Sequence, residues 1–436
     1  MSALFATLGL SEPLLRAVAE QGYASPTPIQ AAAIPAALQG RDLLASAQTG
    51  SGKTAAFVLP LLEQLSRSVR RTPRRTRALV LVPTRELADQ VAETVRTLAE
   101  PLAEPVKVAC LFGGVSVNPQ MMALRGGADV VVATPGRLLD LVERNALGLA
   151  WAGLLVLDEA DRLLDAGFED ELQRVVALLP QRQQRQTLLF SATFPPAVQA
   201  LARALLRDPL RIDLAVDAAD PPAITQRALQ VDTAQRTPLL RHLIAQGHGD
   251  RGWDRVLVFV ATQYATEHVA DKLRRAGIAA AALHGERSQG ARRQALADFK
   301  AGRVQVLVAT DVAARGIDIQ RLPVVVNYDL PRSAADHVHR IGRTARAGEA
   351  GLAISFVTAA TEAHFRLIEK RQGLRLTREV IGGFEPTEVP VASDPTGGIK
   401  GRRKSKKDKL REAAALAAAA ASPAPAPATR ARSARS

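Results

Sequence analysis

The chain has 436 residues, a formal net charge of +14 and one cysteine. This length exceeds one ordinary hydrophobic core and suits two α/β domains with a tail. The lone Cys110 excludes an internal disulfide, and the seven histidines lack the Cys/His spacing of zinc sites. Without a secretory signal pattern or an apolar run of about 18 residues, the sequence predicts a soluble, unexported protein that does not cross a membrane.

Most of the positive charge lies near the C-terminus. Residues 398–436 contain eleven Lys or Arg against Asp408 and Glu412, which accounts for nine of the fourteen net charges. A basic balance favours a polyanionic partner, and the 4% aromatic content favours contacts to a sugar-phosphate backbone over base stacking. The tail, 388–436, is predicted to be disordered. Its Lys/Arg cluster at 400–411 fits an RNA tether and a solubilising segment equally well.

Two series of short β-branched or Leu-rich runs alternate with helical stretches, the pattern of buried parallel strands. The polar, proline-containing segment 210–222 separates them and is the predicted linker. We therefore expect an α/β fold with two tandem parallel-sheet domains, 1–209 and 223–387. The predicted strands are 78–83, 130–134, 154–157 and 187–190 in the first domain, and 256–260, 304–309, 324–328 and 353–357 in the second.

The segment 47–54, AQTGSGKT, follows the apolar stretch 43–45 and precedes an apolar helix, as a phosphate-binding loop requires. In such a loop Lys53 reaches the β- and γ-phosphates and the Thr54 hydroxyl ligates Mg²⁺. The general pattern has Gly where Ala47 stands, so a solvated glycine-rich turn is the alternative interpretation. The remaining residues expected at the nucleotide are Thr49, Gly50, Ser51 and Gly52.

The acidic segment 158–161, DEAD, directly follows the strand predicted at 154–157. At a strand tip Asp158 is placed to hold Mg²⁺ through water, and Glu159 to orient and deprotonate an attacking water. Carboxylates at a helix N-terminus are the alternative explanation. The phosphate loop upstream in the sequence favours a catalytic role for these carboxylates.

AQTGSGKT, with Ala at its start, and DEAD together resemble the DEAD-box ATP-dependent RNA helicases of superfamily 2. The resemblance covers residues 5–384, and SQGAR at 288–292 resembles the bacterial RhlE-like branch. It implies two RecA-like domains, ATP and Mg²⁺ as cofactors, and RNA as a partner.

For the nucleotide, the resemblance implies that Phe5 stacks on adenine, Gln30 hydrogen-bonds its edge and Asp318 contacts the ribose. The segment 339–346, HRIGRTAR, is dense in cations that cannot all be buried in one domain without partners, so an anion should lie opposite. By resemblance, Arg343 and Arg346 are arginine fingers toward the γ-phosphate. The family commonly has Gly where Ala345 stands.

The resemblance also places RNA contacts in both domains. Arginines, threonine hydroxyls and helix N-terminal amides all suit phosphates. A motif near the end of the first domain is expected to couple hydrolysis to strand separation, with hydroxyls that hydrogen-bond Asp161. The RNA-contact residues are Arg85, Gly114, Thr134, Arg137, Arg292 and Thr310, and the coupling residues are Asp161, Ser191, Thr193 and His339.

These features predict an ATP-dependent RNA helicase in which domain closure on single-stranded RNA produces local unwinding or ribonucleoprotein remodelling. An ATP-gated RNA clamp with little unwinding activity is the alternative, and a DNA motor fits less well. Backbone contacts carry no base information, so the RNA target stays open. RNA-decay or ribosome-assembly proteins are candidate partners, and the bacterial cytoplasm is the expected location.

Overall fold

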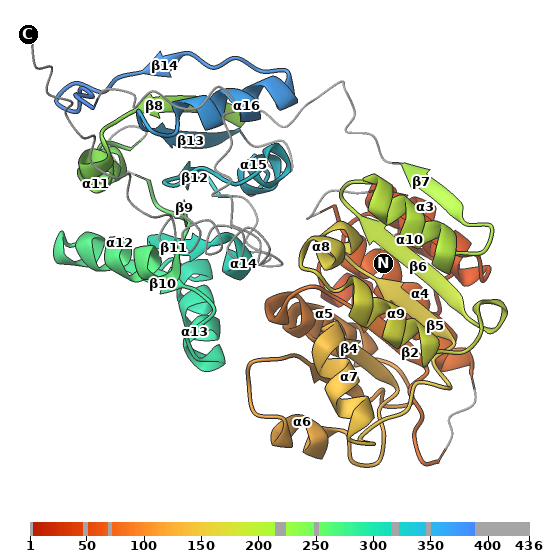
Figure 1. Cartoon of the computed structure of the whole chain (residues 1–436). Coiled ribbons are helices and arrows are strands. Elements are labelled where there is room, and N and C mark those ends of the chain that lie inside the picture. Colours follow the sequence, from red (N-terminus) through yellow and green to blue (C-terminus); the bar gives the residue numbers. More distant parts are fainter. Residues whose placement is uncertain are drawn as a thin grey trace, which may run out of the picture.

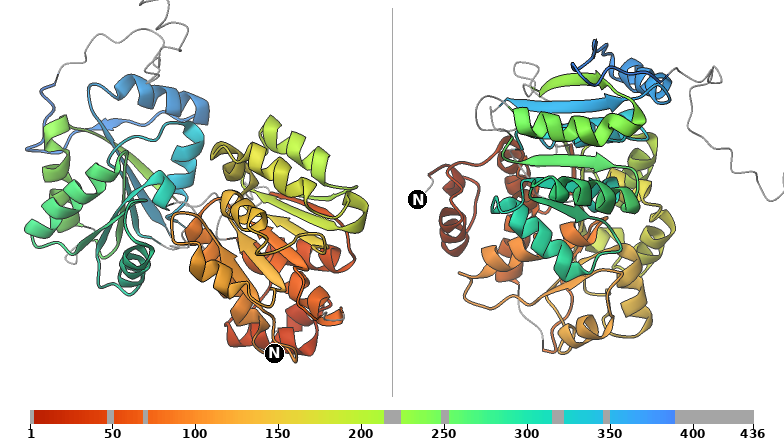
Figure 2. Two further views of the ribbon diagram at one scale, coloured as in Figure 1. Left: turned by 60° about the horizontal axis from the view of Figure 1, so that its bottom comes forward. Right: turned by 90° about the vertical axis from the view of Figure 1, so that its left-hand side faces the viewer.

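The computed structural model describes residues 3–46, 51–68, 72–213, 224–247, 253–314, 322–345 and 350–388. It contains two α/β units, the first coloured red to yellow-green and the second green to blue in Figure 1. Each unit is built on a seven-stranded parallel sheet. The two units lie side by side in Figure 1 and in the left view of Figure 2, and in the right view the second unit lies in front of the first. The predicted two-domain α/β fold is therefore confirmed.

The first sheet has the strand order β3-β4-β2-β5-β6-β1-β7. Its central strands are buried along their whole length because helices cover both faces. All four strands predicted in this domain are present. The strands are β1 (Leu43–Ser46), β2 (Ala78–Leu81), β3 (Val108–Leu111), β4 (Val130–Ala133), β5 (Leu154–Leu157), β6 (Gln186–Ser191) and β7 (Leu210–Asp213).

The two faces of the first sheet carry separate hydrophobic cores. Successive side chains of a strand point to opposite faces, so Val80 joins one core and its neighbours Leu79 and Leu81 join the other. The first core packs helices α1 (Ala3–Ala6), α2 (Glu12–Glu20), α3 (Pro28–Leu38), α4 (Lys53–Arg67) and α5 (Arg85–Ala99). The second packs α7 (Pro135–Glu143), α8 (Ala160–Asp165), α9 (Glu169–Ala177) and α10 (Pro196–Leu205), and short α6 (Asn118–Ala123) and η1 (Arg182–Gln184) complete the domain.

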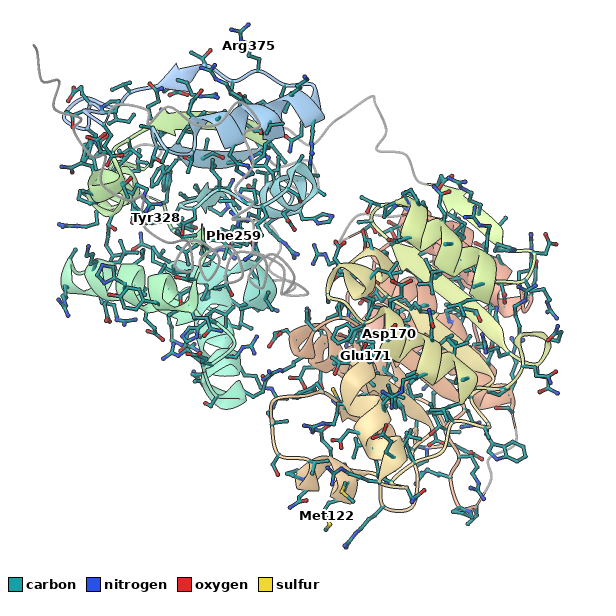
Figure 3. The ribbon with its side chains drawn as sticks, in the orientation of Figure 1. Met122, Asp170, Glu171, Phe259, Tyr328 and Arg375 are labelled. Atoms are coloured by element: carbon teal, nitrogen blue, oxygen red, sulfur yellow. The ribbon has the colours of Figure 1, made fainter. Side chains whose placement is uncertain are left out.

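The second sheet has the strand order β10-β11-β9-β12-β13-β8-β14. The aromatic residue Phe259 lies on one of its central strands, and Tyr328 directly follows another (Figure 3). Its strands are β8 (Ile224–Gln230), β9 (Val256–Val260), β10 (Ala280–Leu283), β11 (Val306–Thr310), β12 (Val324–Asn327), β13 (Gly351–Val357) and β14 (Arg378–Glu379). Its helices are η2 (Thr233–Gln235), α11 (Arg236–Gln246), α12 (Gln263–Arg275), α13 (Gln289–Lys300), α14 (Asp311–Ala314), α15 (Ala334–Ile341) and α16 (Glu362–Gln372).

The structure corrects the start of the predicted linker. Residues 210–213 form β7, which pairs in parallel with β1 at the edge of the first sheet, with Leu43 opposite Leu210. An edge strand buries only part of its side chains, here chiefly Ile212, so it lacks the long apolar run that marked the central strands. The first domain thus extends to Asp213, and the rest of the linker, 214–222, lies outside the described residues.

The second domain ends slightly beyond the predicted boundary at residue 387. The backbone N–H groups of Thr387 and Glu388 donate to the Asp232 carboxylate, and Glu388 accepts from Thr233. These contacts attach the end of the described chain to the turn after β8. The remainder of the predicted tail, 389–436, lies outside the described residues.

Candidate functional site

The phosphate-loop segment joins β1 to α4. Residues 47–50, including Thr49 and Gly50, lie outside the described part, which resumes at Ser51. Gly52 has a φ of +91°, and a Cβ there would lie 2.5 Å from the Gln30 side-chain nitrogen. Gln30 donates from that nitrogen to the Gly52 carbonyl at 3.1 Å and accepts from the Thr27 N–H at 3.0 Å. Glycine is therefore strongly favoured at position 52. The two hydrogen bonds of Gln30 connect the end of the loop to the start of α3.

Lys53 begins α4 and is 5% exposed. Its ammonium nitrogen is buried and has no hydrogen-bond partner in the described structure. Burying a charged group without hydrogen bonds is costly, so this ammonium fits an anionic ligand that would supply acceptors. Thr54 is next on the helix and is half-buried.

The carboxyl end of β5 carries the acidic segment. Burial raises the pKa of Asp158 to about 6; the nearby Lys53 ammonium opposes the rise and the Glu159 carboxylate adds to it. One Asp158 oxygen accepts from the Glu159 N–H at 2.9 Å. Because Lys53 and Asp158 influence each other electrostatically, the structure brings the two sequence motifs together at one edge of the sheet.

Glu159 is buried and has the left-handed conformation, with φ 52° and ψ 51°. This conformation costs roughly 1–2 kcal/mol in a residue with a Cβ, and such strain is concentrated at functional sites. The Glu159 carboxylate accepts from Arg162 at 3.1 Å, and both side chains are buried. The ion pair fixes where this carboxylate points.

The hydrogen bond predicted between Thr193 and Asp161 is present. The Thr193 hydroxyl and N–H donate to one Asp161 oxygen at 2.8 and 3.0 Å. Ser191 differs from the expectation, because its hydroxyl accepts from the Asp161 backbone N–H at 3.2 Å and donates to the Thr193 carbonyl. The network joins the end of β6 to α8.

His339 on α15 brings the second domain to this acidic segment. Burial lowers the pKa of His339, and the nearby Arg162 guanidinium lowers it further. The carboxylates of Asp161 and Glu159 act in the opposite direction. Arg343 is buried close by, whereas Arg346 and Asp318 lie outside the described residues.

Arg340 shows how one cation of segment 339–346 is buried within its own domain. It makes two hydrogen bonds to the Asp311 carboxylate, at 2.6 and 2.7 Å. It also donates to the Asn327 side chain and lies 4.9 Å from the centre of the Phe259 ring. The anion that the sequence required opposite this arginine is therefore Asp311, and Arg340 is structural.

The RNA-contact candidates of the first domain follow three neighbouring strands. Arg85 follows β2 and lies against Gly114, which follows β3; a Cβ on Gly114 would lie 2.1 Å from the Arg85 guanidinium. Thr134 follows β4 at the N-terminal end of α7, and Arg137 donates to the Val115 carbonyl at 2.8 Å. These residues are brought together because parallel strands end at a common edge.

In the second domain, the two RNA-contact candidates differ in accessibility. Thr310 ends β11, is half-buried and accepts from the Ala313 N–H at 3.4 Å. Arg292 on α13 is only 3% exposed and forms a 2.5 Å ion pair with Glu86 on α5 of the first domain. An RNA contact by Arg292 remains a prediction that requires this pair to adjust.

Phe5, the predicted adenine-stacking residue, is completely buried in the first core. A base could stack on its ring only if neighbouring side chains moved. Sequence reasoning also missed Asp89 on α5 and Arg293 on α13, which contact each other across the two domains. The sequence feature that could have indicated this contact is the spacing of Glu86 and Asp89, because residues three apart lie on one face of a helix.

Two family models match the chain: "DEAD/DEAH box helicase" over residues 27–201 and "Helicase conserved C-terminal domain" over residues 236–348. Arabidopsis thaliana DEAD-box ATP-dependent RNA helicase 28 is 43% identical over 381 residues, covering 86% of this chain and 47% of that protein. ATP-dependent RNA helicase DeaD of Escherichia coli K12 is 42% identical over 404 residues, covering 92% of this chain and 60% of DeaD. The chain thus spans less than two thirds of the length of either relative.

The fold matches solved structures over most of its length. Dbp5 of S. cerevisiae, bound to RNA and ADP BeF3, has a TM-score of 0.74 and 34% identity, covering 86% of this chain and 95% of that one. Mss116p, bound to ssRNA and AMP-PNP, has a TM-score of 0.77 at 28% identity, covering 90% and 82%. With two RecA-like domains, both helicase models and these relatives, the chain belongs to the DEAD-box ATP-dependent RNA helicase family.

Proposed function

We propose that this protein is an RNA-stimulated ATPase that uses closure of its two domains to unwind or remodel RNA. The observation that carries the proposal is the buried, unpartnered Lys53 ammonium beside Asp158. A triphosphate supplies the hydrogen-bond acceptors that this ammonium lacks. Dbp5 is described as bound to RNA and ADP BeF3 and Mss116p to ssRNA and AMP-PNP, which supports the same pair of ligands here.

The residues present fit Mg²⁺ bound together with ATP. Among the described residues no group of three or more His, Cys, Asp or Glu has the arrangement of a metal cage. Mg²⁺ beside phosphates needs none, because it binds through one or two protein oxygens, phosphate oxygens and water. Thr54 and Asp158 would hold it, and the ion would neutralise charge on the phosphates.

The chain's own groups divide the remaining work. Glu159, fixed by Arg162, orients the attacking water and takes its proton. Arg343 and Arg346 stabilise charge on the γ-phosphate from the second domain. Phe5, Gln30 and Asp318 hold the nucleoside, and the backbone of Thr49, Gly50, Ser51 and Gly52 holds the phosphates.

RNA binding is divided between the domains in the same way. Arg85, Gly114, Thr134 and Arg137 contact the backbone from the first domain, and Arg292 and Thr310 from the second. Because both ligands bridge the domains, each favours closure and tightens the other. The network of Asp161, Ser191, Thr193 and His339 transmits the state of the nucleotide to the domain interface.

The test is steady-state ATPase activity with and without single-stranded RNA. We expect strong stimulation by RNA in the wild type and its loss in Lys53→Ala. Lys272→Ala, which removes an exposed lysine from α12, is the matched control and should behave as the wild type. An ATPase that ignores RNA would contradict the proposal.

An ATP-gated clamp is the second candidate, because the same motifs and the buried Arg292–Glu86 contact between domains would also serve to hold RNA. Single-turnover strand displacement on a short duplex separates the two. A helicase releases the strand in the presence of ATP, whereas a clamp binds RNA and displaces none.

The finer assignments remain predictions. Within the described ranges no helix is both long and apolar enough to cross a bilayer. The cytoplasmic location, the RhlE-like branch and RNA-decay or ribosome-assembly partners rest on the sequence. For the tail, truncation after Gly397 should weaken RNA binding and reduce its salt dependence if residues 400–411 act as a tether.

A further inference from the structure

A polar contact between the two domains lies outside the residues assigned to ATP or RNA. Helix α13 of the second domain reaches toward α5 of the first (Figure 1). Arg293 donates to both oxygens of Asp89, with distances of 2.6 to 3.0 Å. The Gln289 side-chain nitrogen donates to the same carboxylate at 3.1 Å. One carboxylate of the first domain thus accepts hydrogen bonds from two side chains of the second.

The Arg292–Glu86 ion pair lies one helical turn away from the Asp89–Arg293 contact. Together the two ion pairs fix how α13 is aligned along α5. Glu86 and Asp89 are three residues apart on α5, and Gln289, Arg292 and Arg293 lie within four residues on α13, so each set shares a helix face. Burial raises the pKa of Glu86 despite the nearby Arg292. A buried ion pair adds little net stability. If α13 were aligned differently along α5, however, Glu86 and Arg292 would be buried without each other, which is unfavourable.

Asp89 is held in place from its own domain. The Cys110 thiol on β3 lies 3.7 Å from an Asp89 oxygen and donates to it. Burial raises the pKa of Cys110 to about 12, so the thiol remains a neutral donor at ordinary pH. The carboxylate is therefore oriented toward α13 by a contact that does not depend on the second domain.

We propose that Asp89 and Arg293 form an interdomain latch that positions Gln289 and Arg292 and stabilises the closed arrangement of the domains. The proposal rests on the proposed function, in which closure accompanies RNA binding. Contacts made only when the domains are together favour the closed state, and this bias appears as tighter RNA binding. The latch touches neither ATP nor RNA, so Asp89 and Arg293 are positioning residues.

Charge reversal tests the latch. In Asp89→Arg and Arg293→Asp, like charges face each other, and we expect the RNA concentration for half-maximal ATPase stimulation to rise about tenfold. Turnover at saturating ATP and RNA should stay within about twofold of the wild type, because the catalytic residues are untouched. The double variant restores the opposite charges in exchanged positions and should recover most of the wild-type RNA dependence.

Two variants control for the change in net charge near RNA. Glu93→Arg changes the charge of α5 equally, but within the described part of the chain Glu93 forms an ion pair only with Arg96 of its own helix. Lys300→Asp does the same for α13 at an exposed position. Both control variants should change the RNA concentration for half-maximal ATPase stimulation much less than the latch variants do. Equal shifts in latch and control variants, or a double variant no better than the single ones, would overturn the latch.

A distance measurement separates this idea from the proposed function. Fluorophores on Met122→Cys and Val380→Cys, both at exposed positions of different domains, report domain separation, and Cys110 with its raised pKa labels poorly. Without RNA, both single reversals should lower the fraction of molecules with short separation, and the double variant should restore it. Identical distributions in all proteins would exclude the latch. An ATPase unaffected by RNA, with these shifts intact, would contradict only the proposed function.

Discussion

The two domains have the same strand order once each is numbered from its own first strand, yet they have different chemistry. After the first strand of each sheet, one domain has the phosphate loop and Lys53, while the other has a short turn and α11. After the second strand, both have a threonine that caps the next helix: Thr84 accepts from Leu87, and Thr262 from Ala265. The shared fold fixes where side chains emerge, and the residues at those points decide what they do.

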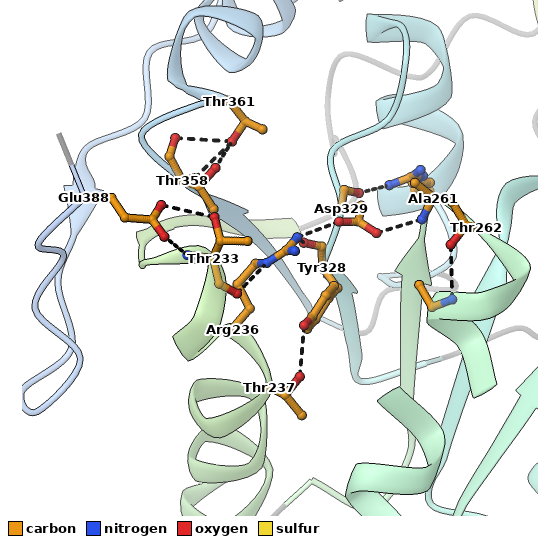
Figure 4. Close-up of polar contacts among 12 residues, drawn as sticks. Thr233, Arg236, Thr237, Ala261, Thr262, Tyr328, Asp329, Thr358, Thr361 and Glu388 are labelled. Atoms are coloured by element: carbon orange, nitrogen blue, oxygen red, sulfur yellow. Dashed lines mark hydrogen bonds and ion pairs between the residues drawn. The ribbon is translucent and has the colours of Figure 1, made fainter. Parts of the chain in front are cut away.

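The end of the fifth strand of each domain, β5 or β12, shows the contrast most clearly. Glu159 follows β5 by two residues and lies next to Asp158, which is near Lys53, whereas the matching Asp329 follows β12 by two residues. Asp329 accepts from Arg236 at 2.5 Å and from the Ala261 N–H at 2.8 Å, so it is fully used inside its domain (Figure 4). Glu159 has one ion pair, with Arg162 on the same helix, whereas Asp329 is held by donors from two other elements, so we expect Glu159 to serve chemistry and Asp329 to serve stability.

Glu159→Gln should produce the largest effect. The amide keeps the size of the side chain but cannot take a proton, so we expect a loss of about 10²–10⁴ in ATP turnover with nucleotide binding retained. Single-turnover hydrolysis and nucleotide titration measure the two quantities. Glu169→Gln at an exposed position of α9 is the control. Unchanged turnover in Glu159→Gln would remove the assigned role.

Asp158→Asn should stabilise the protein in the absence of nucleotide and Mg²⁺. Because the folded pKa of about 6 exceeds the ordinary value of 3.8, the ionised carboxylate destabilises the fold above pH 6. We expect about 2–3 kcal/mol more unfolding free energy at pH 7.5 in the variant, a difference that disappears as the pH falls from 6 toward 4. Urea unfolding at several pH values measures it, and a pH-independent difference would contradict the assignment to this carboxylate.

Asp329→Asn should reduce stability rather than turnover. The amide can satisfy only one of the two donors that face it, which costs about 1–3 kcal/mol. Denaturant unfolding should show the loss, while ATP turnover per folded molecule should stay near the wild-type value. A large fall in turnover at full stability would show that the two matching positions share a function after all.

Ala345→Gly should have the smallest effect. Ala345 has a φ of +53°, so glycine relieves a strain of about 1 kcal/mol, partly offset by the greater freedom of the unfolded chain. This geometry also explains why the family commonly has Gly at that position. Ala301→Gly, at the end of α13 with a φ of −80°, is the control and should be destabilising. Equal changes in both variants would rule out backbone strain as the cause.

The sequence by itself determined the central strands of both sheets, the two-domain division and the positions of the phosphate-loop and DEAD segments. Buried strands are continuous apolar runs, and the phosphate loop and the DEAD segment are contiguous, so each leaves a local pattern. The edge strand β7 left a weaker pattern, because only one side of it is protected, and it was assigned to the linker.

Only the tertiary structure decided which charges meet. Arg340 pairs with Asp311 within its domain, Arg292 pairs with Glu86 between domains, and Lys53 has no hydrogen-bond partner among the described residues. In the sequence all three are simply basic residues in recognisable motifs. Whether a cation is structural, part of an interface or available to a ligand depends on burial and on partners far away along the chain, and local spacing carries no information about either.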